Sequence, residues 1–507
     1  MSESSKVKGT MCRCAVVVPP VVAHNLDPHT GIPFMPHMGA SLAGVLREIG
    51  HDVQVVDCFG GNSHSREMHG EFMFLGLSAE IAASLVHDQT QVCFIYCRQM
   101  SEMAAAKKVA QFIKAAHPSI KICFFENIQA VTSFSFKDVT GDLFESPCDL
   151  LIMGEPEDRA KDIVERFLTN SGFKDILGVA YKEGSTIKLT EASPYNRNLD
   201  ALPLPAWDIF PLDGYWKAGF SHGPVGKERF LPLLTSRGCP YKCKFCLAPH
   251  VNNTWRAHSA KRVVDEIEHF YNLMQVTDFH ISDLNPTVNE KRILEICDLL
   301  IERKLPVSWK LAQGTKIETL SSPATLERMA EAGCVYISFS PESGSKRMLE
   351  SVGKPFDYEH ALRMTAAMHR LGIRSQACFI SGLPGETEAD RLKTIVYMKK
   401  LVKAGLDEIN VPIFTPVPGS EFEKAIEGYS TRAQITFSPT WRKDYSEAHA
   451  FRMKMYRTFF LWKLLHPRKV FREIFGFLTG NFETKMEMSF YKLIKLHAIR
   501  WAPWLFS

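Results

Sequence analysis

Short apolar runs alternate with amphipathic stretches through the first 170 residues. The apolar runs are rich in Val, Ile and Phe, which favours buried strands. They are residues 15–19, 53–57, 92–96, 120–125 and 150–153. Residues 39–49 and 104–116 have apolar positions at helical spacing, and Gly50 follows the first of these stretches as a helix stop. Strands that alternate with helices predict an α/β domain over residues 1–170, built on a doubly wound parallel sheet.

A less regular segment follows at residues 171–228. It contains a predicted hairpin, with strands at 178–181 and 186–190, and then a Pro-rich passage at 202–211. Such passages are extended, so this segment is interpreted as a connector between domains.

A second alternating series occupies residues 229–440. Six predicted strands lie at 231–235, 278–282, 307–311, 335–340, 375–380 and 408–412. The helices predicted between them are 260–274, 290–304, 323–332, 358–371 and 388–404. Six β/α pairs predict a partial (β/α)6 barrel of the TIM type, whose functional groups lie at the carboxyl ends of the strands.

Residues 441–507 are aromatic and basic, with 13 Lys and Arg against 5 Asp and Glu. The pattern predicts a C-terminal helical region with breaks at Pro467, Gly480 and Pro503. Such a region fits a helical cap on the barrel, or helices that lie on an anionic membrane surface. Peripheral membrane contact is therefore one hypothesis for this region.

Composition narrows the class of protein. A chain of 507 residues is too long for one hydrophobic core. Its N-terminus is polar, and no apolar run is long enough to span a bilayer, so we expect a cytoplasmic protein. Thirteen cysteines are too sparse for a disulfide scaffold, and three of them stand at a tight spacing typical of metal binding.

These three cysteines form the motif CxxxCxxC at Cys239, Cys243 and Cys246, just after the first predicted barrel strand. Three thiolates can hold three irons of a [4Fe-4S] cubane and leave the fourth iron open to a ligand. A Cys3His zinc site completed by His250 or His258 is the alternative.

The segment from Ser236 to Cys246 resembles the signature of the radical S-adenosylmethionine (SAM) family, with Phe245 as the aromatic residue before the third cysteine. Three later elements also resemble this family: Ser282-Asp283, the ESGS-like stretch from Glu342 to Ser345, and the GLPGET-like stretch from Gly382 to Thr387. The resemblance covers roughly residues 230–430. It implies a [4Fe-4S] cluster on the three cysteines. It also implies SAM contacts at Phe245, Ser282, Asp283, Glu342, Ser343 and Gly382.

The N-terminal domain, connector and barrel together resemble the cobalamin-binding (B12) subclass of that family. This likeness implies cobalamin contacts at Met38, Gly39, Leu42, Ser78, Gly154 and Glu155. The cobalt-ligating motif DxHxxG is absent, so His29 and His37 are interpreted as loop histidines. A flavodoxin-like domain that binds nothing is the alternative.

The resemblance implies a methyltransferase that acts on an unactivated carbon through a 5′-deoxyadenosyl radical and methylcobalamin. A radical SAM cyclase or rearrangement enzyme without methyl transfer is the first alternative, and a metal-binding protein without turnover is the second. We expect a small-molecule substrate, for which a lipid and a secondary-metabolite intermediate are the two candidates. An external one-electron reductant such as flavodoxin or ferredoxin is expected, and nucleic acid is not.

Overall fold

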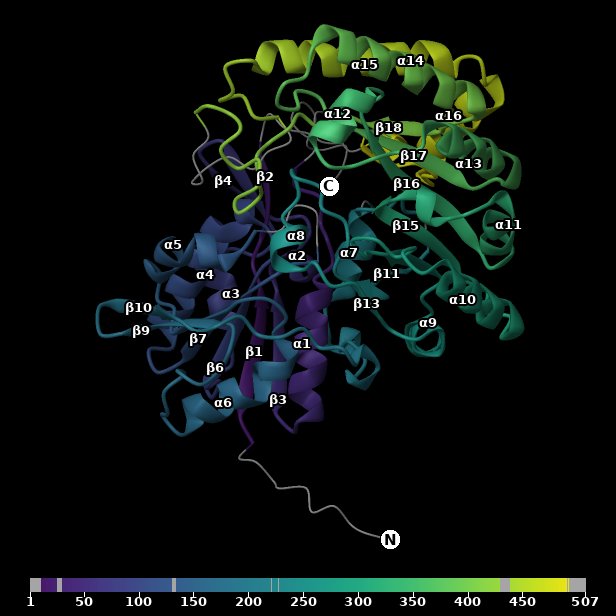
Figure 1. Cartoon of the computed structure of the whole chain (residues 1–507). Coiled ribbons are helices and arrows are strands. Elements are labelled where there is room, and N and C mark those ends of the chain that lie inside the picture. The colour runs from purple at the N-terminus through teal and green to yellow at the C-terminus, as the bar shows by residue number, and fades with distance from the viewer. Residues whose placement is uncertain are drawn as a thin grey trace. The chain divides into compact units, whose positions relative to one another are not determined.

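The computed structural model describes residues 11–24, 30–129, 134–219, 221–226, 228–428, 438–489 and 491. They fold into two compact units (Figure 1). The first unit comprises Met1–Val22, Pro36–Ile128 and Ser133–Gly214. The second comprises Ala23–Met35, Gln129–Thr132 and Tyr215–Ser507.

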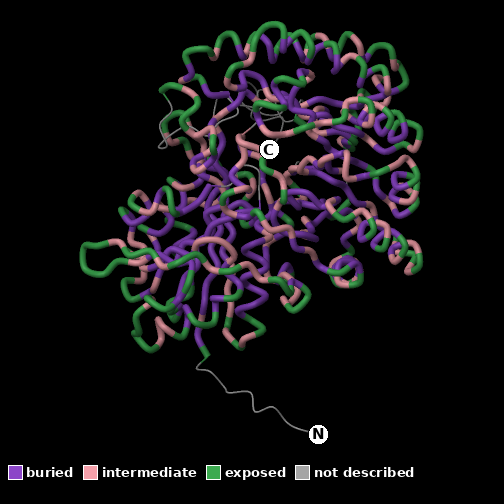
Figure 2. Tube along the Cα trace, viewed as in Figure 1, coloured by how far each residue is buried: buried purple, intermediate pink, exposed green. Residues whose placement is uncertain are grey.

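The first unit is built on a seven-stranded sheet with the order β10-β9-β8-β7-β6-β1-β3. Its strands are β1 (Arg13–Val18), β3 (Asp52–Asp57), β6 (Val92–Cys97), β7 (Lys121–Glu126), β8 (Leu150–Ile152), β9 (Val179–Glu183) and β10 (Thr186–Leu189). The strands from β3 to β8 pair in parallel, as the apolar runs predict. Apart from the edge strand β3, which is partly exposed, their side chains are almost wholly buried, which is typical of a parallel sheet covered on both faces (Figure 2).

Helices connect these strands. They are α1 (His37–Glu48), α2 (Cys58–Gly61), α3 (Ala79–Leu85), α4 (Met103–Ala116), α5 (Thr140–Phe144) and α6 (Ala160–Leu168). A small second sheet, ordered β2-β5-β4, has strands of four residues each, too short for a periodic signal in the sequence. They are β2 (Val21–His24), β4 (Arg66–His69) and β5 (Phe72–Leu75).

The hairpin expected in the connector is formed by β9 and β10, and β9 pairs antiparallel with β8. It therefore extends the sheet of the first unit. The Pro-rich passage that follows packs on α1, where the Ala206 N–H donates to the Ala40 carbonyl at 2.9 Å. A Cβ on Gly44 would lie 2.4 Å from the Leu204 carbonyl oxygen, so this close approach requires glycine.

The second unit contains a parallel sheet of six strands, ordered β11-β14-β15-β16-β17-β18. They are β11 (Phe230–Leu233), β14 (Asp278–Ile281), β15 (Ser308–Thr315), β16 (Cys334–Glu342), β17 (Arg374–Phe379) and β18 (Glu408–Asn410). The main helices between them are α9 (Ala260–Met274), α10 (Glu290–Glu302), α11 (Pro323–Glu331), α13 (Tyr358–Leu371) and α14 (Glu388–Ala404). The predicted partial barrel is confirmed.

Shorter elements were not predicted. The two-residue strands β12 (Ser236–Arg237) and β13 (Arg256–Ala257) pair antiparallel beside the cysteine motif. The short helices are α7 (Leu212–Ala218), α8 (Ala248–Val251) and α12 (Lys346–Ser351).

Two helices, α15 (Tyr445–Lys463) and α16 (Pro467–Thr479), confirm the predicted helical region over the C-terminal residues that the structure describes. The breaks at Pro467 and Gly480 coincide with helix ends, whereas Pro503 lies outside the described residues. Among the described helices, none combines the length and apolarity that crossing a membrane requires.

Candidate active site

The cysteine motif begins in a tight turn after β11 and β12. Gly238 has a φ of +79°, and a Cβ there would lie 2.2 Å from the Thr254 carbonyl oxygen, so the turn requires glycine. The next N–H, of Cys239, donates to the Asn252 carbonyl at 3.0 Å. The motif therefore starts from a fixed backbone at the carboxyl end of a barrel strand, where barrel enzymes place their functional groups.

Asp283, two residues after β14, holds the segment that leads into this turn. Its carboxylate accepts the N–H of Thr235 at 2.7 Å, the hydroxyl of Thr235 at 2.6 Å and the hydroxyl of Ser236 at 2.5 Å. Burial raises the pKa of Asp283, and the bonds from Ser236 and Thr235 oppose that rise. Both carboxylate oxygens are thus engaged by the protein, so Asp283 acts here as a positioning residue, and its contact with SAM stays a prediction.

The three cysteines are half-buried and unpaired by disulfides. Burial raises the pKa of each thiol, that of Cys246 to about 12. These thiols are therefore protonated in the metal-free protein and would lose their protons as metal binds. The donor set fits a cubane, whose three thiolates each bind a different iron and need not converge on one ion.

A zinc ion makes the opposite demand, because its ligands must meet at one point. Within the described ranges, no group of three or more His, Cys, Asp and Glu side chains is placed to hold a metal ion. The Cys3His alternative with His250 or His258 is therefore not formed among these residues.

A buried ion pair lies beside the thiols. Glu342 ends β16 with a φ of +60°, at an irregularity in the pairing of β16 with β17. The ammonium of Lys354 donates to Glu342 Oε1 at 2.6 Å, and both side chains are largely buried. Burial lowers the pKa of Lys354, but Glu342 and Cys243 outweigh that effect, so Lys354 stays charged. A fixed cation next to three cysteines favours their thiolate forms.

Phe245 connects the cysteine motif to two other sequence elements. It packs against a cluster formed by Met348, Val352, Leu383 and Phe414. The neighbouring Lys244 N–H donates to the Val352 carbonyl at 3.0 Å. Leu383 belongs to the GLPGET-like stretch, and Met348 follows the ESGS-like stretch. The structure therefore brings the three predicted elements of the barrel to one place.

The remaining predicted SAM residues have mainly backbone or packing roles. The Ser343 hydroxyl is wholly buried, lies 3.1 Å from the Thr394 hydroxyl and accepts the Ser345 N–H. The Ser282 hydroxyl donates to the His280 carbonyl at 3.2 Å. Gly382 has a φ of +74°, and its N–H donates to Glu386 at 2.9 Å. Their contacts with SAM stay predictions.

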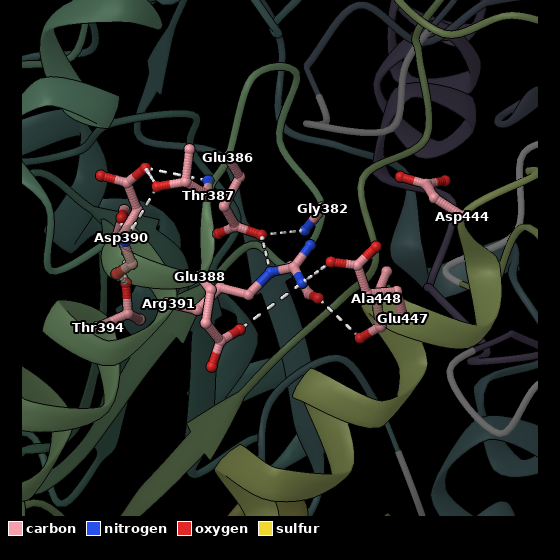
Figure 3. A network of polar contacts seen from close by, with 12 residues as sticks. Gly382, Glu386, Thr387, Glu388, Asp390, Arg391, Thr394, Asp444, Glu447 and Ala448 are labelled. Carbon is pink, nitrogen blue, oxygen red and sulfur yellow. Dashed lines mark hydrogen bonds and ion pairs between the residues drawn. The ribbon is translucent and has the colours of Figure 1, made fainter.

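Figure 3 follows the Gly382 turn into α14. Thr387 and Asp390 form a capping box at the start of this helix. Arg391 donates to Glu386 at 3.1 Å and also pairs with Glu447 of α15. The turn is therefore fixed from the helix that follows it and from the C-terminal helices.

The predicted cobalamin residues of the first unit fall into two groups. Met38 and Leu42 lie on α1 with no exposed surface, so they pack in the core. Ser78 caps α3 by accepting the Ile81 N–H at 3.2 Å. Gly39 is also buried on α1, where a Cβ would contact Pro36, Val16 and Phe210 at 3.6 to 3.8 Å, whereas a Cβ on Gly154 would meet only Arg159, at 3.9 Å.

Gly154 and Glu155 lie in the loop after β8, and Glu126 fixes this loop at the end of the neighbouring strand β7. Glu126 is buried and accepts the N–H of Gly154 at 2.6 Å and that of Phe136 at 2.5 Å. Burial raises the pKa of Glu126 to about 7, against these two bonds. The Glu155 carbonyl accepts a bond from Arg159.

Sequence reasoning missed Glu126 and Lys354. Glu126 ends an apolar run with a lone acid, and such an acid at the carboxyl end of a parallel strand is a usable signal. Lys354 lies in Gly353-Lys354-Pro355, a sequence that predicts only a turn.

Cys93 and Cys97 are wholly buried in β6 and burial raises the pKa of both thiols, which fits core residues. His37 is the first residue of α1, and His29 lies outside the described residues.

A surface hollow of about 650 Å³ opens elsewhere on the second unit. Its lining includes Lys304, Val307 and Gly333, at the amino ends of β15 and β16. Ligands of parallel α/β folds bind at the carboxyl ends, so we assign this hollow no role in the chemistry.

Comparison with known proteins identifies a family match and several relatives of this chain. Residues 233–398 match the family model described as the Radical SAM superfamily. An uncharacterized methyltransferase of Pyrococcus horikoshii is 28% identical over 342 residues, which cover 65% of this chain and 71% of that protein. The anaerobic magnesium-protoporphyrin IX monomethyl ester cyclase of Rubrivivax gelatinosus is 27% identical over 408 residues, 76% of this chain and 70% of the cyclase.

Two solved structures share the fold. One is the radical SAM methyltransferase TsrM of Kitasatospora setae with cobalamin and a [4Fe-4S] cluster bound; its TM-score is 0.63 at 14% identity, over 82% of this chain and 78% of TsrM. The other is the cobalamin-dependent SAM radical enzyme OxsB with aqua-cobalamin; its TM-score is 0.61 at 16% identity, over 88% of this chain and 56% of OxsB. With the cysteine motif on a parallel barrel and the family match across it, residues 233–398 are identified as a radical SAM domain.

Proposed function

We propose that this protein is a cobalamin-dependent radical SAM methyltransferase that methylates an unactivated carbon of a small molecule. The observation that carries the proposal is the half-buried triad Cys239, Cys243 and Cys246, with the charged Lys354 beside it. When bound, the cluster with SAM would supply a 5′-deoxyadenosyl radical, and cobalamin would carry the methyl group.

The chain's own residues hold and orient these groups. The three thiolates would bind three irons, and Phe245 would lie beside the adenine on its apolar cluster. Lys354 and Glu342 present a cation and a carboxylate next to the cysteines, which suits the carboxylate and the amino group of SAM. Asp283 and Gly238 fix the loop so that the thiols keep their positions.

Cobalamin binding rests on the first unit. The carboxyl ends of its parallel strands lead into glycine turns. The Gly154 turn is fixed by Glu126 of the neighbouring strand, which accepts the Gly154 N–H. The space beside Gly154, where a Cβ would meet only Arg159 at 3.9 Å, allows a bulky planar ligand to approach the backbone. Such a ligand would bind without a histidine from a DxHxxG motif.

The first test is cofactor analysis of anaerobically purified protein. We expect iron, sulfide and cobalt, and 5′-deoxyadenosine after reduction in the presence of SAM. Cys243→Ala should lose the iron and the 5′-deoxyadenosine, whereas Cys297→Ala, which removes a buried thiol from α10, should keep both. Iron-free protein that holds zinc would overturn the proposal.

Ring closure without methyl transfer is the second candidate, because the Rubrivivax gelatinosus relative is a cyclase. The mass of the product separates the two reactions. A gain of one CH2 supports methylation, and turnover that consumes SAM without such a gain supports cyclisation or rearrangement. In either case an external one-electron reductant of the flavodoxin or ferredoxin type would feed the cluster.

We also propose that the C-terminal helices contact an anionic membrane surface. Eight large apolar side chains of α15, α16 and the short turn between them are between 52% and 76% exposed, more than scattered surface residues explain. They are Phe460, Leu461, Leu464, Leu465, Phe471, Ile474, Phe475 and Leu478. The exposed cations Arg457 and Arg468 lie on the same two helices, and this mixture suits an interface with anionic lipid.

Vesicle sedimentation tests this contact. Vesicles with phosphatidylglycerol should bind the protein more strongly than pure phosphatidylcholine, and Phe471→Ser with Leu478→Ser should weaken that binding. Leu189→Ser, which changes an exposed leucine of β10, is the matched control. A dimer in solution with no vesicle binding would assign these side chains to a second copy of the chain instead.

A further inference from the structure

The interior of the barrel in the second unit is polar. Side chains at alternate positions along the strands pack there, and they carry hydroxyl, amide, thiol, imidazole and charged groups. They include His280, Lys310, Tyr336, Ser338, Gln376, Cys378 and Glu408. Most of these groups have partners within the barrel, so the exceptions indicate where a ligand could bind.

Residues 481–489 close the open side of this barrel. The Phe482 N–H donates to the Val225 carbonyl at 3.3 Å, just before the edge strand β11. The Met486 N–H donates to Glu408 at 2.6 Å, in the other edge strand β18. The segment therefore bridges the two edges that a six-stranded barrel leaves unpaired.

The carboxylate of Glu408 accepts hydrogen bonds from this segment and from two barrel strands. Besides the Met486 N–H, its carboxylate accepts the Tyr336 hydroxyl at 2.5 Å and the Gln376 side-chain amide at 3.0 Å. Glu408 thus anchors the segment, and its charge also attracts the Lys485 ammonium without forming an ion pair with it.

Lys485 extends from the anchored segment into the barrel. Its ammonium donates to the Ala312 carbonyl at 2.5 Å and lies 5.7 Å from the centre of the Tyr336 ring. Among the residues that the structure describes, it forms no ion pair. Burial lowers the pKa of Lys485, although Cys378 and Glu408 oppose that change.

The absence of an ion pair at Lys485 among the described residues is unusual, because four other largely buried lysines of this unit each pair with a carboxylate. The ammonium of Lys310, in the same barrel, lies 2.5 Å from Asp278. Lys354 pairs with Glu342, Lys463 with Glu473, and Lys469 with Asp407. A desolvated ammonium with one neutral acceptor is costly, unless an anion joins it when the protein works.

His222 supplies a second open group at the same place. Its imidazole also donates to the Ala312 carbonyl, and its ring lies 4.7 Å from that of Phe34. Its Nε2 has no hydrogen-bond partner among the described residues. Burial, and then the charge of Lys485, lower the pKa of His222, so this nitrogen carries a free lone pair.

From this arrangement we propose that Lys485 and His222 form a substrate subsite inside the barrel, which takes an oxyanion group such as a carboxylate. Lys485 binds the oxyanion, and the Nε2 of His222 accepts a bond from a neighbouring hydroxyl or N–H of the same molecule. Cys378 lies within electrostatic reach of both Lys485 and Glu342, so the subsite is close to the candidate SAM residues. The assignment of the bound group to a substrate rests on the proposed function, whereas the anion site itself does not.

Alkylation of Cys378 tests the subsite with small reagents of known charge. Iodoacetate carries a carboxylate, and iodoacetamide is its neutral counterpart. The ratio of their rates at Cys378, measured by peptide mass spectrometry on cluster-loaded protein, cancels any change in the thiolate fraction. We expect Lys485→Met to lower this ratio about tenfold, because two unit charges a few ångströms apart in a desolvated interior attract strongly.

Two controls make the result specific. Lys485→Arg keeps the charge and should keep the ratio, and Lys400→Met removes a lysine from the exposed face of α14 and should leave the ratio unchanged. An equal ratio in the wild type and in Lys485→Met would overturn the proposal, and so would a Cys378 that neither reagent reaches. Formation of 5′-deoxyadenosine is followed in the same samples, so a failure of the radical chemistry is seen separately from a failure of the subsite.

Discussion

Each unit places a buried glutamate at the carboxyl end of a parallel strand, and the two glutamates are stabilised in opposite ways. Glu342, at the end of β16, forms an ion pair with Lys354 beside the three cysteines. Glu126, at the end of β7, accepts two backbone N–H groups and has no such lysine among its bonds. The first arrangement places charge where a metal and a sulfonium cofactor are expected, whereas the second shapes a glycine turn.

The difference teaches what each ligand face demands of the sequence. Binding iron needs a particular side chain, so the cysteines of the second unit stand out by type and spacing. A large planar cofactor such as the proposed cobalamin would need open backbone, and the glycines and core residues predicted for it in the first unit carry little chemical signature.

The largest effect should come from removing one thiol from each of the two units and comparing the results. Cys239→Ala is expected to abolish iron loading and 5′-deoxyadenosine formation, because a cubane corner loses its ligand. Cys93→Ala removes a wholly buried thiol of β6 and should keep both, at a cost of about 1 kcal/mol in the free energy of unfolding. Iron analysis of the two proteins checks this, and equal iron in both would break the comparison.

The second-largest effect should come from removing Lys354, the cation that pairs with Glu342, which lowers the free energy of unfolding. Lys354→Met leaves a buried carboxylate without its partner, which we expect to lower the free energy of unfolding by about 4 kcal/mol. Adding Glu342→Gln should restore most of that loss, because the uncompensated charge is then gone. Denaturant unfolding measures both variants; a double variant no more stable than Lys354→Met would argue against the ion pair.

Glu126 should make stability depend on pH in the opposite sense from an ordinary surface acid. Burial raises its pKa from 4.5 to about 7, so the folded state binds the proton more tightly than the unfolded chain does. The stabilisation is complete below about pH 4.5 and is lost as the pH rises through 7, and amounts to about 3 kcal/mol.

The measurement compares the wild type with Glu126→Gln at several pH values. Because Glu487 also has a pKa raised by burial, to about 7, only the difference between the two proteins reports on Glu126. A difference in the free energy of unfolding that stays constant between pH 5 and 8 would show that Glu126 does not titrate there.

Much of the fold follows from local sequence signals. Helix α13 matches its predicted bounds because Asp357 caps its start and Gly372, with a φ of +78°, ends it. The triad and Phe245 could also be predicted from the sequence as candidate site residues, since their spacing is local. Lys354 could not be predicted in this way. The helix α12 separates it in sequence from its partner Glu342, and the position of Glu342 depends on the irregular end of β16.

Asp283 shows a different limit. The sequence placed it correctly at the end of a barrel strand, but not its partners. Which groups occupy its carboxylate depends on the paths of Thr235 and Ser236, and so on tertiary structure. Lys485 lies still further away in sequence from the strands that surround it, and no local pattern marks it.

The smallest effect separates two glycines of the first unit. Gly154 has a φ of +80°, a conformation that costs an L-residue about 1 kcal/mol, although a Cβ would meet only Arg159 at 3.9 Å. Gly141 lies in α5 with nothing within 4 Å, so alanine there should stabilise the helix by about 1 kcal/mol. Gly154→Ala and Gly141→Ala should therefore shift the free energy of unfolding in opposite directions. If the Gly154 turn also faces cobalamin, Gly154→Ala should lower cobalt retention after desalting while Gly141→Ala leaves it unchanged. Equal retention in both would move the cofactor away from this turn, because a methyl group there would then have displaced nothing.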